Sequence, residues 1–296
     1  MSDFAESALC CKFFLLKCHF NFYFLRFALL EILHLQFAQN ALFVALLISI
    51  CGGIVGALII SNKIVFLSGG VAHSAFGGVG IALFFGFHTM LGAGLMAVFM
   101  SLVLLYFVRF RKQNIDSFIA ASWAFGVALG IILIDITPGY ALDITSYLFG
   151  SILATSKEDI LVIALYDALL VGFVSVYYRE ILSVSYDEIF CKLKGLKTQV
   201  FLSVMFVFIS VGIVMTMSVA GLILVLAILS IPSYIAGMFV QSLRAMMVVA
   251  SILSLIFILG GFVASYHYNL SVGACVVMSA VGGMIVAQIF KFILRK

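Results

Sequence analysis

The sequence predicts an all-α, polytopic membrane protein with about 8–9 transmembrane helices. Of its 296 residues, 65% are apolar and only 9% are charged, whereas soluble domains contain roughly 45–50% apolar and about 25% charged residues. Apolar runs of roughly 18–22 residues recur along most of the chain, and each is long enough to cross a bilayer core. Because these runs are continuous rather than alternating, they exclude a transmembrane β-barrel.

The expected spans follow one another with short connections. Eight are expected at approximately Ala38–Ile60, Leu67–Phe87, Met90–Val108, Ser117–Asp135, Asp159–Tyr178, Val200–Ser218, Val219–Met238 and Ala245–Ala264. A ninth, Ser271–Leu294, carries the chain almost to its end. Since the sixth and seventh runs are contiguous, one of the two is a candidate half-helix rather than a full span.

Two further segments do not read as clean spans. Residues 1–35 carry Lys12, Arg26 and Glu31 among aromatic side chains, which predicts an interfacial helix, with an extra span as the alternative. The chain from 36 to 296 is then one transmembrane domain. The segment Ile136–Lys157 is too polar to face lipid, so we expect an outer-surface or re-entrant helix that packs against protein.

Lysine and arginine gather in alternate connections between the expected spans. These are Lys63, the run Arg109–Lys112, the stretch Arg179–Lys197, Arg244 and the tail from Lys291 to Lys296. Cytoplasmic loops carry an excess of such residues, so we place all of them inside. The same alternation places His88, the segment 137–156 and the loop around His267 on the outer side. We expect the protein in the cell membrane, which is the inner membrane in a cell that has two.

The longest polar stretch, Tyr178–Lys197, predicts a short cytosolic helix. Ser185 and Glu188 have the spacing of a capping box, and Gly195 marks a C-terminal stop. A helix this short needs a surface on which to pack, so we interpret it as the docking element for a cytosolic partner. The residues assigned to this coupling element are Ser185, Tyr186, Asp187, Glu188, Phe190 and Gly195.

Composition also excludes several function classes. No nucleophile with its base, phosphate-binding loop or cofactor fingerprint is recognisable, so we expect no enzyme activity, no ATP hydrolysis by this chain and no bound cofactor. The net charge of +4 arises from short loops and does not indicate nucleic-acid binding. The six cysteines are interpreted as small hydrophobic residues rather than as disulfide partners.

Two ionisable residues lie inside expected spans, where such groups are costly and often functional. His73 lies in the second span among small residues, where a neutral imidazole can serve as a metal ligand on a pathway. The alternative is a hydrogen-bonded histidine inside the bundle. Asp167 lies near the middle of the fifth span. It either lines the pathway or bonds a hydroxyl of a neighbouring helix, and we favour the second interpretation.

The outer loops supply further candidates. Asp135 and Asp143 flank the polar outer segment and are candidates for an acidic vestibule for cations, with a solvated loop as the alternative. His88 and His267 fall in outer loops and are candidates for a metal entry site, with simple exposure as the alternative.

Four stretches resemble the ABC-3 class of ATP-driven importer permeases for zinc, manganese or iron. They read FAQNALFVALLISICGGIVG with SGGVAHSAFGGVGIAL, DITSYLFGSILATSKEDI, REILSVSYDEIFCKLKG and VAGLILVLAILSIPSYIAGM. They resemble, respectively, the family's first two spans with an "SHA…G" pattern, its "LFGSIL" segment, its coupling region and its "IPAATA" segment. Together they cover most of the chain from Phe37 onward.

The resemblance implies a fold similar to that of the vitamin B12 and siderophore permeases, with the chain forming a homodimer around a central pathway in the bilayer. It implies two cytosolic ATP-binding subunits docked at the helix around Ser185–Gly195 and a separate extracytoplasmic metal-binding protein. It also implies that His73 corresponds to the family's pathway histidine. Residues 36–296 would then be the permease domain.

The chain departs from the family pattern at one position beside this histidine. Many members carry an acidic residue four positions earlier, one helical turn away on the same face, where this chain has Gly69. A lone imidazole favours zinc, whereas manganese prefers oxygen ligands. Zinc is therefore the first expected cargo, with manganese or iron next. The alternatives are a permease for a metal chelate, and a gradient-driven secondary transporter with Asp167 as proton relay.

Overall fold

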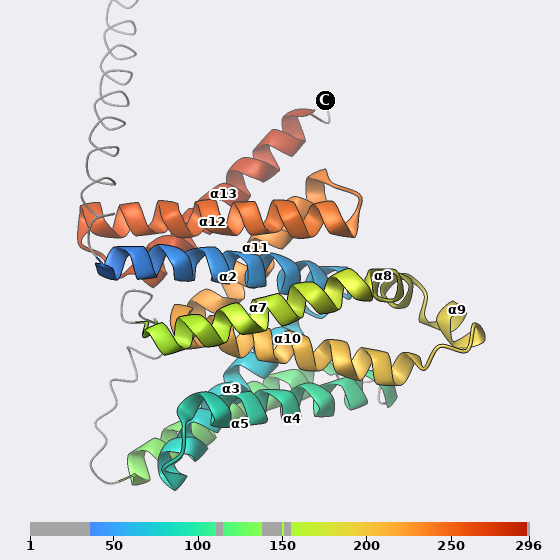
Figure 1. Ribbon diagram of the computed structural model, residues 1–296, viewed down its shortest axis with the longest axis horizontal. Helices are drawn as coiled ribbons and strands as arrows, with labels where there is room; N and C mark the ends of the chain where they lie inside the picture. The colour runs from blue at the N-terminus through green and yellow to red at the C-terminus, as the bar shows by residue number, and fades with distance from the viewer. Residues whose placement is uncertain (1–35, 111–114, 138–149, 151–154, 295–296) are drawn as a thin grey trace, which may run out of the picture.

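The computed structural model describes residues 36–110, 115–137, 150 and 155–294, and every regular element in this part of the chain is an α-helix (Figure 1). The elements are α2 (Gln36–Ser61), α3 (Val65–Phe85), α4 (Thr89–Phe110), α5 (Ile115–Ile136), α7 (Lys157–Val176), α8 (Tyr178–Tyr186), α9 (Glu188–Leu193), α10 (Thr198–Ala220), α11 (Leu222–Phe239), α12 (Leu243–Tyr268) and α13 (Val272–Leu294). The interfacial helix expected within residues 1–35 lies outside the described residues. So does most of the segment 136–157, in which an outer helix was expected.

Within the described residues, 9 helices are long and apolar enough to cross a membrane. These are α2, α3, α4, α5, α7, α10, α11, α12 and α13. Each coincides with one of the expected spans. The all-α membrane fold predicted from the apolar runs is thereby confirmed.

The boundary between α10 and α11 answers the question of a half-helix. Gly221 has φ +84°, a backbone conformation that favours glycine, and it separates the two helices. The Ala220–Gly221 turn lies against Gly150, whereas the start of α10 lies beside α9, where the Thr198 hydroxyl donates to Glu188 at 3.5 Å. After α11, the connection through Gln241 borders α8. Both helices therefore cross the full bundle, and neither is a half-helix.

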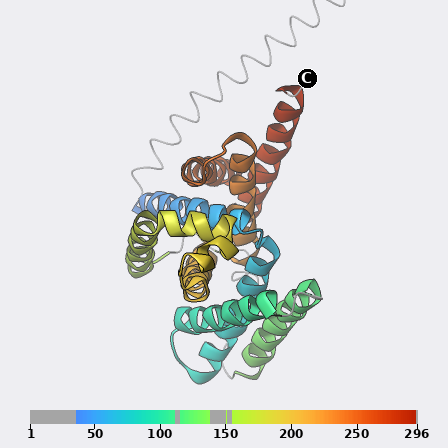
Figure 2. The same ribbon diagram turned by 90° about the vertical axis from the view of Figure 1, so that its right-hand side faces the viewer.

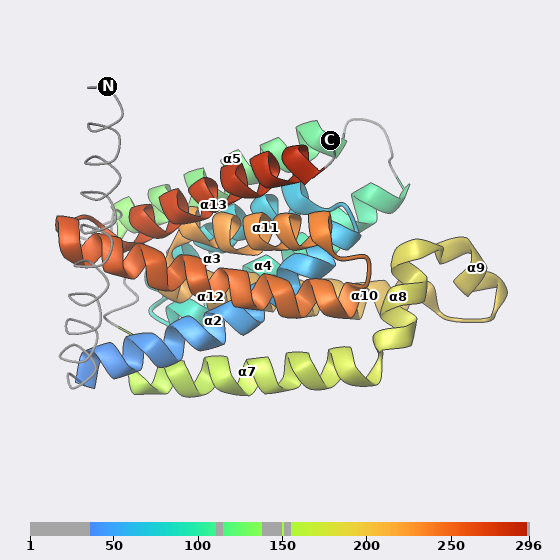
Figure 3. The same ribbon diagram turned by 90° about the horizontal axis from the view of Figure 1, so that it is seen from above.

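Successive spans run in opposite directions, so the basic connections gather at one end of the bundle. We call this the basic end; it carries α8 and α9, at the right of Figures 1 and 3. The contact of Arg244 with Tyr178 joins the start of α12 to α8 there. The positive-inside bias makes this the cytosolic end. The opposite end carries the Ala220–Gly221 turn and the connection between α12 and α13.

The helices form three groups, seen from the basic end in Figure 2. One group consists of α3, α4 and α5, and another of α11, α12 and α13. Between them lie α2, α7 and α10, with α2 packed on both α11 and α12. The central position of α2 and α10 links the two outer groups.

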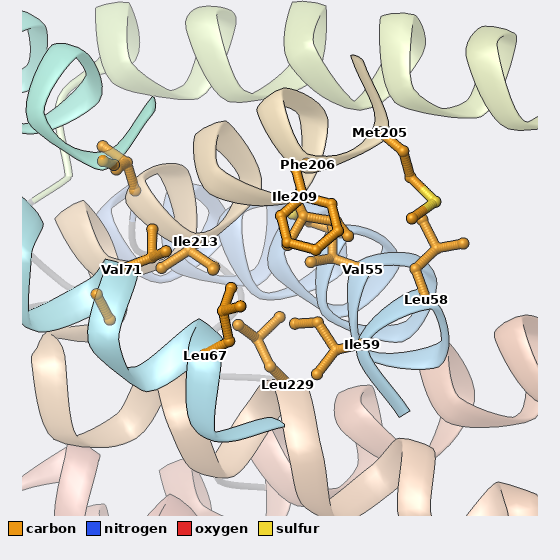
Figure 4. Packing of buried hydrophobic residues seen from close by; sticks show 14 of the residues in the cluster. Val55, Leu58, Ile59, Leu67, Val71, Met205, Phe206, Ile209, Ile213 and Leu229 are labelled. Carbon is orange, nitrogen blue, oxygen red and sulfur yellow. The ribbon is translucent and has the colours of Figure 1, made fainter. Parts of the chain in front are cut away.

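The main hydrophobic core lies where α2, α3, α10 and α11 meet (Figure 4). Val55 and Leu58 of α2 are fully buried there, as is Ile213 of α10. Leu67 of α3 and Leu229 of α11 close the cluster from the other side. Through this core α10 is in contact with α2, α3 and α11.

Glycines allow close contacts between helices within the α3–α5 group. A Cβ atom on Gly77 would lie 2.8 Å from the carbonyl oxygen of Gly126, and one on Gly126 would lie 2.5 Å from Cα of Ser74. Glycines also allow close contact between α12 and α13, where a Cβ on Gly261 or Gly283 would lie 2.4 Å from Val276 or Phe257, whereas the neighbouring Gly260 and Gly282 have open space.

Replacing Gly126 with valine is expected to prevent stable assembly of the α3–α5 group. The added side chain meets backbone atoms, which cannot move aside as a flexible side chain would, and overpacking typically costs about 1–3 kcal/mol or more. The measurement is the yield and melting temperature (Tm) of detergent-purified protein. Gly172→Val is the matched control, since nothing lies within 4 Å of its added Cβ; equal Tm values for the two variants would contradict the packing assignment.

Candidate functional site

The polar stretch after α7 forms two short helices rather than the single expected one. The helix α8 follows α7 after Tyr177 alone and runs through Ser185 to Tyr186. Asp187 then adopts an extended conformation and caps α9, its Oδ1 accepting from the Phe190 N–H at 2.9 Å. The expected capping box of Ser185 with Glu188 is therefore wrong: Ser185 is inside a helix, and its buried hydroxyl has no hydrogen-bond partner.

The helix α9 is fastened at both ends. Glu188 forms an ion pair with Lys192 at 2.9 Å and accepts the bond from Thr198 at the start of α10. Cys191 is 1% exposed and anchors the buried side of the helix. Gly195, at φ +81°, ends it, so the expected C-terminal stop is present. The helix α9 is thus joined to the start of α10 by a side-chain hydrogen bond and by the hydrogen-bonded turn at Leu196.

The outward side of α9 and the last residue of α8 are apolar and exposed. Tyr186 is 76% exposed, Ile189 72% and Leu193 83%. Phe190 is half exposed beneath the Lys194 ammonium, which lies 4.6 Å from its ring centroid. Large apolar side chains clustered on a polar end of a protein mark an interaction surface. We call these four residues, Tyr186, Ile189, Phe190 and Leu193, the docking surface.

His73 occupies a distinctive position on α3. Every residue from Leu67 to Gly80 is buried except His73, which is half-buried. Its ring lies 4.7 Å from the ring of Trp123 on α5, centroid to centroid, at an interplanar angle of 55°. The imidazole is therefore packed against an aromatic neighbour and remains partly accessible.

Trp123 also accounts for the glycine at position 69. A Cβ atom on Gly69 would lie 2.5 Å from Cζ2 of the indole and 3.0 Å from its Nε1. The tryptophan thus fills the space that an acidic side chain one turn before His73 would need. Sequence reasoning missed Trp123, although it is the single tryptophan of the chain, because the contact joins residues on different helices.

Asp167 is buried between α7 and its neighbours α2 and α10. Its side chain is 4% exposed, and neither carboxylate oxygen has a hydrogen-bond partner. The expected bond to a neighbouring hydroxyl or tyrosine is therefore wrong; the adjacent Tyr166 hydroxyl donates instead to the Phe208 carbonyl at 2.7 Å. Asp167 lies near Cys51 of α2, whereas His73 packs on α5, so the two are not brought into one site.

Replacing Asp167 with asparagine is expected to leave transport intact and to raise Tm. A buried carboxylate without partners destabilises the fold, and a neutral side chain of the same shape removes that cost. The measurement pairs Tm of the purified protein with cellular metal uptake. Loss of uptake with unchanged Tm would contradict a purely structural role and favour the proton-relay alternative.

The outer candidates do not converge. Asp135 is exposed in the last turn of α5, and His267 is exposed in the last turn of α12 beside Tyr268, with ring centroids 5.0 Å apart. Figure 1 shows α5 and α12 on opposite sides of the bundle. His88, exposed between α3 and α4, lies on the α5 side, and Asp143 lies outside the described residues. In the described part of the chain, no three His, Cys, Asp or Glu residues form a group that could hold a metal ion.

Comparison with known proteins decides the family. The model of the ABC 3 transport family matches residues 34–291. The chain belongs to the ABC 3 transport family. This ABC 3 protein is therefore a multi-pass membrane permease, the membrane-spanning subunit of an ABC transporter, and ATP hydrolysis belongs to a partner ATPase.

Individual relatives extend along most of this ABC 3 protein. The Synechocystis "Uncharacterized membrane protein slr2045" is 38% identical over 89% of this chain and 94% of its own length. A "Probable metal transport system membrane protein" of Chlamydia muridarum is 32% identical over 76% of this chain and 79% of its own. The "Manganese import system permease protein ScaB" of Streptococcus parasanguinis is 27% identical over 83% of this chain and 87% of its own.

Solved structures share the fold. A chain of "PsaBC from Streptococcus pneumoniae in complex with Fab" superposes with a TM-score of 0.79 at 25% identity, covering 87% of this chain and 93% of the other. A chain described as part of a metal-chelate type ABC transporter, inward-facing, gives 0.64 at 17% identity, with 85% of each chain covered. The permease fold implied by the resemblance, similar to that of the vitamin B12 and siderophore permeases, is confirmed.

Proposed function

We propose that this ABC 3 permease imports divalent transition-metal ions, driven by a partner ATPase. The observation that carries the proposal is the half-buried imidazole of His73, the one opening in an otherwise buried stretch of α3. Two relatives, named as a metal transport and a manganese import protein, support the same cargo class. A neutral imidazole binds transition metals readily and releases them when the geometry changes.

The coupling route follows from the packing of α8, α9 and α10. A cytosolic ATPase seated on the docking surface would push or pull α9 during its own closure. Glu188 of α9 accepts a hydrogen bond from Thr198 at the start of α10, so α9 would move with α10. Since α10 forms the core with α2, α3 and α11, its displacement shifts α3 and changes the access of His73 to either side. Transport then proceeds by alternating access, with no covalent chemistry in this chain.

The identity of the ion is a finer part of the proposal. Zinc is favoured by the ligand chemistry, since His73 offers an imidazole packed on an indole and the position one helical turn earlier is Gly69 rather than an acid. Manganese is the second candidate, because relatives that are 27% identical are named for manganese import. Iron is third on the same ligand grounds.

We also propose an assembly for this permease. Each chain offers one docking surface, so a homodimer would seat two ATP-binding subunits. An extracytoplasmic metal-binding protein would deliver the ion at the opposite end, where His267 and Asp135 are exposed. The PsaBC structure, whose chain this one resembles, supports a complex of this kind. Cross-linking mass spectrometry of the membrane complex checks the stoichiometry.

The test is the total zinc, manganese and iron content of cells that lack the gene, grown under chelator limitation. The proposal predicts a deficit in one of the three metals, restored by the wild-type gene. Zinc is the first candidate for the affected metal, and manganese is the second. Normal levels of all three would contradict metal import and favour a chelate permease, which a growth assay on metal chelates would then reveal.

A further inference from the structure

A groove between α2, α7 and α12 is not used by the proposed transport route. Its volume is about 630 Å³, within the range of roughly 300–1,000 Å³ typical of small-molecule sites. Its lining is apolar along the spans and polar only through two serines and at the basic end. The lining residues are Ile50, Ile54, Val171, Val174, Ser175, Tyr178, Arg244, Met247, Val248, Ser251 and Ile252.

Arg244 supplies a cation at the basic end of this groove. Its guanidinium carbon lies 4.0 Å from the centroid of the Tyr178 ring. Stacking uses the flat face of the guanidinium, so its N–H donors, which lie in the plane, stay available for a planar or tetrahedral anion. No carboxylate in the described residues forms an ion pair with Arg244, which leaves its charge uncompensated.

A second groove continues past Tyr178 into the cytosolic surface. It has a volume of about 440 Å³ and is lined by Tyr178, Leu182, Ser183, Tyr186, Gln241, Ser242 and Leu243. It offers hydroxyl and amide groups, and neither groove is lined by an aspartate or glutamate. Together the two grooves present an apolar channel within the membrane, a cation at its cytosolic end and neutral polar groups beyond.

We propose that these grooves bind an anionic phospholipid of the cytosolic leaflet. An acyl chain would lie against the apolar lining between α2, α7 and α12, the medium around these spans being lipid. The phosphate would bind Arg244, and the headgroup would reach the polar groups of the second groove. Basic pockets between transmembrane helices on the cytoplasmic side are suited to such headgroups. This proposal does not depend on the transported cargo.

The position of the groove gives the lipid a structural consequence. Tyr178 is the first residue of α8, and Arg244 is in the first turn of α12. A lipid held by both residues would join the start of α8 to the start of α12. Its binding would therefore stabilise the orientation of α8 relative to the membrane.

The test measures Tm of the detergent-purified full chain against added phosphatidylglycerol or phosphatidylcholine. A ligand that binds the folded state raises Tm with its concentration, so phosphatidylglycerol should raise Tm more than phosphatidylcholine. Arg244→Gln should weaken this effect by about tenfold in lipid concentration, the size expected for a lost charge-assisted hydrogen bond. Arg179→Gln, an exposed neighbour that lines neither groove, should respond like wild type.

A photoreactive phosphatidylglycerol with its reactive group in the acyl chain keeps the test decisive if Arg244→Gln does not fold. In the wild-type protein it should label peptides from α2, α7 and α12, in competition with unlabelled phosphatidylglycerol. Labelling that phosphatidylcholine suppresses equally would overturn the proposal. So would residue-to-residue cross-links between two copies of the chain across Val248, which would show that a second copy covers the groove.

Discussion

Cells carrying the double substitution Asp187→Lys and Glu188→Lys are expected to lose metal uptake almost completely while retaining the protein in the membrane. A lysine in place of Asp187 could not accept the N–H of Phe190, a cap worth typically about 1 kcal/mol. A lysine in place of Glu188 would face Lys192 with like charge. The favourable ion pair and the repulsion that replaces it are each worth a few tenths of a kcal/mol. A helix as short as α9 is marginal, so about 1–2 kcal/mol suffices to unwind it.

The same loss is small against the global stability of a folded domain, about 5–15 kcal/mol. The variant should therefore assemble its spans and be detected at normal levels in membranes. Any partner ATPase that still associates should hydrolyse ATP without transport. The measurement is initial metal uptake per amount of membrane protein, together with ATPase activity of the membranes.

Three controls separate the causes of this effect. Asp187→Asn keeps a side-chain oxygen that can cap α9 and should retain most uptake. Glu158→Lys reverses an exposed charge at the opposite end of the bundle and should be neutral. Leu193→Glu keeps the cap but places charge in the docking surface, so it should lower uptake as the double variant does. Normal uptake by the double variant would show that the coupling assignment is wrong.

Replacing His73 with alanine is expected to lower metal uptake by about tenfold or more, the scale seen when metal-site partners are removed. The substitution leaves the pathway without its imidazole, while α8, α9 and the docking surface are untouched. Assembly with an ATPase should therefore be normal. The measurement is the concentration dependence of zinc and of manganese uptake, with membrane level of the protein as normalisation.

Matched histidines provide the control for this prediction. His88→Ala and His267→Ala remove exposed imidazoles at the opposite end and should change uptake far less. Trp123→Phe keeps an aromatic ring beside His73 and should have an intermediate effect, since the imidazole stays but is held less firmly. If His73→Ala transports both metals like wild type, His73 is a packing residue and the pathway lies elsewhere.

The span order and the common end of the basic loops were predictable from sequence because both depend on the bilayer. Hydrocarbon sets the length of each apolar run, and the distribution of Lys63, Arg244 and Lys291 follows the sidedness of the membrane. The sequence left open whether one of the two helices that meet at Gly221 is a half-helix. Only the contacts at both ends of these helices answer that question, and they join residues far apart in the chain.

The errors arise where a local pattern competes with tertiary packing. The Ser-x-x-Glu pattern at Ser185 satisfies the rule for a capping box, but α8 continues through it and Asp187 takes the cap. A capping box does form at Ser156 and Asp159, at the start of α7. The contact of Trp123 with Gly69, and the absence of a partner for Asp167, depend on how helices pack and have no local signal.

The most direct test of the account is the initial rate of radiolabelled zinc and manganese uptake in cells that lack the gene. The cells would carry wild type, the Asp187→Lys/Glu188→Lys variant or the Glu158→Lys control. The account predicts that wild type and Glu158→Lys restore uptake of one metal, zinc first, and that the double variant does not. Equal uptake by cells carrying wild type, the double variant and the control would contradict coupling through α9. Equal uptake by cells that carry no copy of the gene would contradict a metal permease.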